Sequence, residues 1–232
     1  MLQYTDSTRK NGEKVNRDSV ASWYVQTLHG LTYLHWRGVL HRDLKPGNLF
    51  LSENQEALQI GDLGSAALMP GPGPHPAKRT VVRGSVTTPA YSSPEVWAGK
   101  NFMPASDVWS VGASFFEVMT MESLFSGESP AKMEEAVLAF DIEHPSREPE
   151  RNSAGRAYAA LRDSHMGQVA AELAELLRQD PLRRPMAATL AKRPATMHRL
   201  RTVLARCCLQ GEEAEKQAHF ASFERAVSES EA

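Results

Sequence analysis

The chain has 232 residues, 41% of them hydrophobic and 23% charged, so it is long and apolar enough to build a sizeable globular core. Its formal net charge of −2 gives no electrostatic footprint for nucleic acid or for an anionic membrane. No apolar run has membrane length, so we expect neither a nucleic-acid nor a membrane partner.

The first predicted element is a helix that starts near Asp18, whose side chain is expected to cap the free amides of the first turn. The segment before it, residues 1–16, is polar and rich in turn-forming residues. Apolar side chains recur at helical spacing along the predicted helix, which indicates a buried face. They are Val20, Trp23, Tyr24, Leu28, Leu31 and Leu34.

The next segment carries the chemistry. Residues 41–48 read His-Arg-Asp-Leu-Lys-Pro-Gly-Asn, and Asp62-Leu63-Gly64 follows at a short distance. In-line phosphoryl transfer needs a carboxylate to accept the proton of the attacking hydroxyl, and oxygen ligands for magnesium on the phosphates. Asp43 would be the base and Lys45 would neutralise charge on the moving phosphoryl group. Asn48 and Asp62 would bind the metal.

Between the two proposed metal ligands, the apolar residues 49–51 and 58–60 flank the polar stretch 52–55. This pattern predicts a short β-hairpin that sets the distance between Asn48 and Asp62. A single Asp-Leu-Gly is usually only a turn, and a single His-Arg-Asp is an ordinary surface tripeptide. Their order and spacing together are what give the motif its meaning.

With these motifs the chain resembles eukaryotic serine/threonine protein kinases, which implies a mainly α large lobe with a small β-hairpin at the catalytic loop, and ATP and Mg²⁺ as cofactors. His41 is then a structural residue of the loop. Lys45 favours serine or threonine as the acceptor, and Thr88 is expected to pack between the base and that lysine. Residues 88–95, Thr-Pro-Ala-Tyr-Ser-Ser-Pro-Glu, are similar to the end of an activation segment, with Ser93 in place of the usual alanine.

Residues 66–83 contain Pro70-Gly71-Pro72-Gly73-Pro74 and then Pro76, which predicts a flexible loop and excludes helix and central strand. The resemblance implies that Arg42 binds a phosphate on this loop through charge-assisted hydrogen bonds. Ser85 is the expected acceptor of that phosphate, followed by Thr87 and Thr80. The structural alternative is that Arg42 only packs and hydrogen-bonds locally.

Two further motifs extend the resemblance. Asp107 opens a stretch that is apolar on nearly every face and must form a buried helix. Its carboxylate is expected to hydrogen-bond the backbone of the catalytic loop, or simply to cap the helix. Residues 180–185, Asp-Pro-Leu-Arg-Arg-Pro, place Arg184 where it should form an ion pair with Glu95.

The rest of the chain is predicted to be mostly helical. Helical periodicity runs over 130–140 and 169–178, a polar loop over 141–155, and a partly helical tail follows a kinase-like domain of residues 1–195. The tail, 196–232, should present Leu200, Val203, Leu204 and Cys207 on one side. Since the two cysteines, Cys207 and Cys208, are adjacent and suit neither a disulfide nor a zinc site, we expect an intracellular, cytoplasmic or nuclear location.

The sequence contains no glycine-rich phosphate loop, strand lysine or helix glutamate of the small kinase lobe, so we expect that lobe to be missing here. Three interpretations stay open. The first is a serine/threonine kinase lobe, with local sequence similar to NIMA-related kinases, that acts on protein substrates when a small lobe is supplied. The second is a catalytically dead lobe that binds a partner through the face a small lobe would cover. The third is a small-molecule phosphotransferase, which the motifs at Glu95, Asp107 and Arg184 disfavour.

Overall fold

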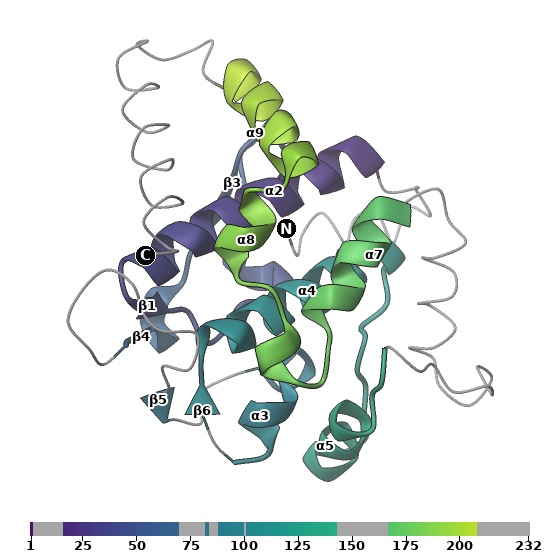
Figure 1. Cartoon of the computed structure of the whole chain (residues 1–232). Coiled ribbons are helices and arrows are strands. Elements are labelled where there is room, and N and C mark those ends of the chain that lie inside the picture. Colours follow the sequence, from purple (N-terminus) through teal and green to yellow (C-terminus); the bar gives the residue numbers. More distant parts are fainter. Residues whose placement is uncertain (2–15, 70–81, 84–87, 100, 143–166, 208–232) are drawn as a thin grey trace.

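A computed structural model describes residues 1, 16–69, 82–83, 88–99, 101–142 and 167–207. Over these residues the fold is mainly α-helical, as expected, with three antiparallel sheets of two strands each (Figure 1). The helices are α2 (Arg17–Trp36), α3 (Pro94–Trp97), α4 (Pro104–Thr120), α5 (Pro130–Leu138), α7 (Gly167–Leu176), α8 (Ala187–Ala191) and α9 (Pro194–Cys207). The paired strands are β1 (Val39–Leu40) with β4 (Ala67–Leu68), β2 (Leu49–Leu51) with β3 (Leu58–Ile60), and β5 (Val82–Arg83) with β6 (Asn101–Phe102).

Helix α4 forms the centre of the core and is buried from Pro104 to Val118, as its continuous apolar sequence predicts. Pro104 occupies the first turn, where its missing N–H costs nothing, and Met121 ends the helix in a left-handed conformation. Helices α2 and α7 both pack against α4. Gly112 allows the close approach of the end of α7, since a Cβ there would lie 3.1 Å from Leu176 and 3.0 Å from the side chain of Leu177, which follows the helix.

The predicted helix is present as α2, but its N-cap is Asn16 and not the predicted Asp18. Asn16 is the N-cap, and its Oδ1 accepts hydrogen bonds from the amides of Asp18 at 3.0 Å and Ser19 at 3.1 Å. Asp18 therefore lies in the first turn, where a carboxylate stabilises the helix dipole instead. The predicted apolar face is buried except at Leu34, which is half-buried, whereas the neighbouring His35 is 4% exposed.

The predicted β-hairpin is confirmed: β2 pairs with β3 in a register that sets Leu49 opposite Ile60 and Leu51 opposite Leu58. The indole of Trp23 in α2 donates to the carbonyl of Gln55 at 2.7 Å, which fastens the hairpin turn to the helix. This bond anchors the turn of the hairpin to the core helix α2.

The prediction of a loop over 66–83 is wrong at its two ends. There, Ala67–Leu68 is a strand paired with β1, and Val82–Arg83 is a strand paired with β6. Each pair is only two residues long, and such short pairings carry little sequence signal. The proline- and glycine-rich run that motivated the prediction lies outside the described residues, and so does the predicted polar loop beyond Ile142.

Helix α9 crosses the predicted domain boundary at residue 195. Leu200 and Val203 are buried, and Leu200 packs with Val25 of α2 and Ala191 of α8. The start of the predicted tail is thus helical and belongs to the packed body (Figure 1). Across the ranges that the structure describes, no helix combines the length and hydrophobicity needed to cross a bilayer.

Candidate active site

The catalytic loop predicted from the sequence is held by one buried carboxylate, that of Asp107. Its Oδ2 accepts from the backbone N–H of His41 at 2.9 Å, and its Oδ1 accepts from the backbone N–H of Arg42 at 2.9 Å. Asp107 is 1% exposed and lies inside α4, whose N-cap is Met103. The expected bond to the loop is therefore present, and the alternative role as a helix cap is not observed.

Sequence reasoning missed a third partner of Asp107. The Nε2 atom of His35, near the end of α2, lies 2.9 Å from its Oδ2. One carboxylate thus joins the end of α2, the start of the catalytic loop and the central helix. The available signal was a histidine placed beside the apolar stripe of α2, but its partner is far away in the sequence.

His41 connects the catalytic loop to the segment that carries Asp62. Its side chain is fully buried, and Nε2 lies 2.9 Å from the carbonyl oxygen of Gly61. The Gly61 amide in turn donates to the carbonyl of Asn48 at 3.0 Å. These contacts give His41 the structural position that the sequence predicted for it.

Asp43 is the centre of a compact polar cluster. Lys45 Nζ donates to Oδ2 of Asp43 at 2.7 Å, while the Thr88 hydroxyl at 2.7 Å and the Thr88 amide at 2.9 Å donate to Oδ1. Lys45 Nζ also donates to the Thr88 hydroxyl at 2.8 Å, so Thr88 bridges Asp43 and Lys45. Partial burial acts to raise the pKa of Asp43, but Lys45 and Thr88 outweigh it and hold the pKa below its ordinary value.

The two proposed metal ligands lie at the same end of the hairpin. Asn48 is 5% exposed, and its Nδ2 donates to the Asp43 carbonyl at 2.8 Å, which fixes the amide so that Oδ1 is the atom left for a cation. Asp62 has an exposed side chain and a left-handed backbone, with φ of 59°. Amide and carboxylate oxygens are ligands that Mg²⁺ prefers, so this pair fits the ion chemically.

Arg42 has a left-handed backbone with φ of 68°, a conformation that is strained for a non-glycine residue. Its Nε donates to the Ser65 carbonyl at 2.5 Å, and its guanidinium carbon lies 5.4 Å from the centroid of the Phe102 ring. The local packing that the sequence left as an alternative role is therefore present. The three proposed phosphate acceptors, Ser85, Thr87 and Thr80, all lie outside the described residues.

The expected pair of Glu95 and Arg184 is present and is a bidentate ion pair. Arg184 Nη1 lies 2.8 Å from Oε1 of Glu95, and Nη2 lies 2.9 Å from Oε2. Arg184 is fully buried, and three of its remaining donor contacts go to backbone carbonyls, those of Arg178, Gln179 and Ala105. Ser106, which the sequence reasoning missed, donates to Glu95 Oε1 at 2.7 Å.

The electrostatics of Glu95 follow from this setting. Burial acts to raise the pKa of Glu95, but the charge and hydrogen bonds of Arg184, with the hydroxyl of Ser106, overcome it and lower the pKa. The pair joins the end of the activation-like segment to the turn before α8. The segment 88–95 is thus held at one end by Asp43 and Lys45, through Thr88, and at the other end by Arg184, through Glu95.

Comparison of the chain with known proteins identifies its family. A family model described as "Protein kinase domain" matches residues 2–195. Human serine/threonine-protein kinase Nek5 is 27% identical over 186 residues, 80% of this chain and 23% of that protein. Mouse Nek3 is 32% identical over 121 residues, 52% of this chain and 22% of that protein. A probable WNK8 kinase of Oryza sativa subsp. japonica is 37% identical over 134 residues, 57% and 20% respectively. The chain therefore spans less than a quarter of these relatives.

Proposed function

The chain belongs to the protein kinase domain family, and from that premise we propose that it is the large lobe of a kinase that transfers the γ-phosphate of ATP to serine or threonine of protein substrates. The observation that carries the proposal is the cluster in which Lys45 and Thr88 both donate to the carboxylate of Asp43. A carboxylate held in this way is ionised at neutral pH and can accept a proton from an incoming hydroxyl group.

In the proposed mechanism, Asp43 orients the substrate hydroxyl and accepts its proton, while Lys45 places positive charge beside the transferred group. Asn48 and Asp62 would hold Mg²⁺, which neutralises charge on the ATP phosphates when it is bound. Asp107 acts as a positioning residue, because it binds the backbone N–H groups of His41 and Arg42, just before the base. Glu95 and Arg184 are structural residues that hold the segment 88–95, where the protein substrate would bind.

We propose further that the 232-residue chain is inactive by itself. In this family ATP is bound from both lobes, and the glycine-rich loop and strand lysine of the small lobe do not occur in this sequence. Two oxygen ligands leave Mg²⁺ largely hydrated and leave the nucleotide weakly held. The domain limits, 1–195 with a tail from 196, belong to the same proposal, although α9 ties the start of the tail to α2.

The test compares the chain alone with a chimera that carries the small lobe of human Nek5 ahead of Met1. We expect no thermal stabilisation of the chain alone by millimolar Mg-ATP, whereas the chimera should be stabilised, since a ligand at a hundred times its Kd adds about 2.7 kcal/mol. The chimera should phosphorylate serine and threonine peptides. Asp43→Asn should slow that reaction by roughly 10²–10⁴-fold without removing the stabilisation by Mg-ATP.

Two outcomes would count against parts of this proposal. Stabilisation of the chain alone that disappears in Asp62→Ala would show that the large lobe binds nucleotide without help. A chimera that binds Mg-ATP yet transfers no phosphate would favour the second candidate, a lobe that binds a protein partner. Leu63, 51% exposed, and Leu68, 76% exposed, support that candidate, because apolar side chains on an open surface favour association.

Regulation by phosphate on the loop before Thr88 is a separate proposal. In the part of the chain that the structure describes, Arg42 donates through Nε to the Ser65 carbonyl. Its two terminal guanidinium nitrogens would then be the donors for a phosphate. We expect mass spectrometry of the protein from its native cells to detect phosphate on Ser85, or on Thr87 or Thr80, in the active fraction. An active fraction unmodified at all three positions would contradict this role for Arg42.

A further inference from the structure

Two aromatic rings and an arginine form a surface cluster at the end of α2, which we call the α2 patch: Tyr33, Trp36 and Arg37. The ring centroids of Tyr33 and Trp36 lie 5.9 Å apart, and the guanidinium carbon of Arg37 lies 5.8 Å and 5.9 Å from them. Arg37 Nη1 also donates to the Tyr33 hydroxyl at 3.0 Å. These contacts orient the guanidinium before any ligand arrives, which favours binding of an anionic group.

An exposed leucine extends the α2 patch beyond the helix. Leu68 of β4 lies opposite Val39 of β1 and is 76% exposed, whereas the next residue, Met69, is buried. The amide of Met69 donates at 2.8 Å to the carbonyl of Gly38, the residue that follows Arg37. Leu68 therefore lies beside the end of α2 (Figure 1). Aromatic rings, an arginine and an exposed aliphatic side chain together are typical of surfaces that bind a protein segment.

The charge of the α2 patch is positive. Arg37 is exposed, and no carboxylate of the described residues forms an ion pair with it. Electrostatic complementarity therefore favours a binding segment that combines acidic residues with apolar side chains.

The chain contains such a segment in residues 208–232, which lie outside the described structure. They include six glutamates against one lysine and one arginine. Phe220, Phe223 and Val227 recur at helical spacing, so a helix would place all three on one face. Glu224 follows Phe220 by four residues and would border that face.

The other long segments outside the described structure lack this acidic character. Residues 2–15 and 70–81 each have more basic than acidic residues, and residues 143–166 have equal numbers of the two. Among these segments, charge therefore selects 208–232 as the one that fits the α2 patch.

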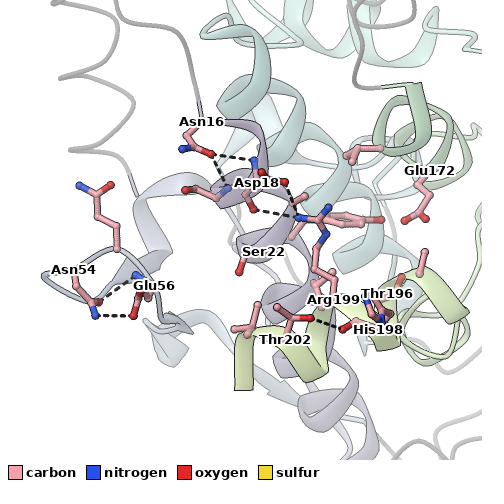
Figure 2. A pocket seen from close by; sticks show the side chains of 18 residues that line it. Asn16, Asp18, Ser22, Asn54, Glu56, Glu172, Thr196, His198, Arg199 and Thr202 are labelled. Carbon is pink, nitrogen blue, oxygen red and sulfur yellow. Dashed lines mark hydrogen bonds and ion pairs between the residues drawn. The ribbon is translucent and has the colours of Figure 1, made fainter. Parts of the chain in front are cut away.

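The segment 208–232 starts from a helix that is already attached to α2. Arg199 of α9 lies 3.3 Å from Oδ1 of Asp18 in the first turn of α2, at the edge of the pocket that Figure 2 shows. Further along both helices, Leu200 packs with Val25. Residue 208 directly follows α9, so the segment leaves the body of the protein from the same helix whose far end carries the patch.

The length of the segment is sufficient to reach the α2 patch. From Val25 to Trp36 the helix α2 rises by about 17 Å, and from Leu200 to Cys207 the helix α9 rises by about 10 Å. The twelve residues 208–219 can span about 40 Å when extended, which exceeds the sum of these two distances.

We propose that residues 208–232 dock on the α2 patch of their own chain, with Phe220 and Phe223 against the apolar side chains and Glu224 on Arg37. The α2 patch lies directly before β1, which leads into the catalytic loop at His41. The docked segment would thus cover the surface next to the strand that enters this loop. The inference does not depend on phosphoryl transfer by the chain.

Hydrogen exchange of the full 232-residue chain, followed by mass spectrometry, tests the docking. Amides of residues 216–230 should exchange roughly tenfold more slowly in the chain than in a synthetic peptide of residues 208–232, because short helices are marginal in water. Arg37→Glu should remove most of this protection. Arg17→Glu is the matched control, since it makes the same charge change at the exposed start of α2, and it should keep the protection.

A charge exchange separates loss of docking from misfolding. Glu224→Arg alone should also lose protection, whereas the double variant Arg37→Glu with Glu224→Arg should regain it. A second variant, Leu68→Ser, tests the apolar part of the α2 patch and should weaken protection as well.

Three results would overturn the proposal. One is exchange of residues 216–230 as fast in the chain as in the peptide, and another is a double variant that exchanges as fast as Arg37→Glu. The third is protection that rises with protein concentration, because the occupant of the α2 patch would then be the segment of a second copy.

Discussion

Replacing Glu95 with alanine should destabilise the protein by about 3–5 kcal/mol, the cost of leaving one partner of a buried ion pair without the other. Arg184 is fully buried, and both of its terminal nitrogens lie within 2.9 Å of Glu95. Removal of the carboxylate would leave a cation in the core with only backbone carbonyls and the ring of Trp109, 4.9 Å away, to stabilise it. Chemical denaturation measures the effect as a lower midpoint at unchanged slope.

The matched control is Glu128→Ala, which removes an exposed pair between Glu128 and Lys132, 2.9 Å apart on the surface. Exposed pairs contribute little, so this variant should unfold close to the wild-type midpoint. Equal midpoints for Glu95→Ala and the wild type would mean that the buried pair does not contribute to folding.

The same pair makes stability depend on pH in a defined direction. Because the folded pKa of Glu95 is depressed, its contribution is present above the unfolded pKa of about 4.3 and is lost as the pH falls through the folded pKa. The difference in unfolding free energy between the wild type and Glu95→Gln should therefore be constant from neutral pH down to about 5 and shrink below about 4. A difference that grows with acidification would have the wrong sign for this explanation.

Asp107→Ala should have an effect of similar size, about 3 kcal/mol or more, because it leaves buried donors without an acceptor. The carboxylate accepts from two backbone amides of the catalytic loop, and His35 Nε2 lies 2.9 Å from it. One of those amides belongs to Arg42, whose backbone is held at φ of 68°. Loss of Asp107 would thus release a strained residue directly before the proposed base.

Asp107→Asn is the control for this variant, because it keeps the shape and one acceptor oxygen and should lose less stability than Asp107→Ala. Denaturation gives the two free energies, and hydrogen exchange at the His41 and Arg42 amides gives the local effect. Both amides should exchange faster in Asp107→Ala. Protection of these amides equal to wild type would show that another group holds the loop.

The sequence by itself determined the family, the mainly α fold and the order of the motifs around Asp43. It did so because the catalytic-loop motif, the hairpin and the buried α4 are encoded by local spacing and apolar pattern. The pair of Glu95 and Arg184 was also predictable, but only through resemblance, since no local pattern connects residues so far apart in the chain.

Only the tertiary structure decided which groups complete these motifs. The bond of His35 to Asp107 and the bond of Ser106 to Glu95 depend on how the helices pack against each other. The periodicity of apolar residues along the sequence does not predict that packing. Asn16 and Asp18 are both good capping residues and lie two positions apart, so the sequence alone does not decide which of them caps α2. Helix α9 packs back on α2, which buries Leu200 and Val203, and no single segment of the sequence predicts this packing.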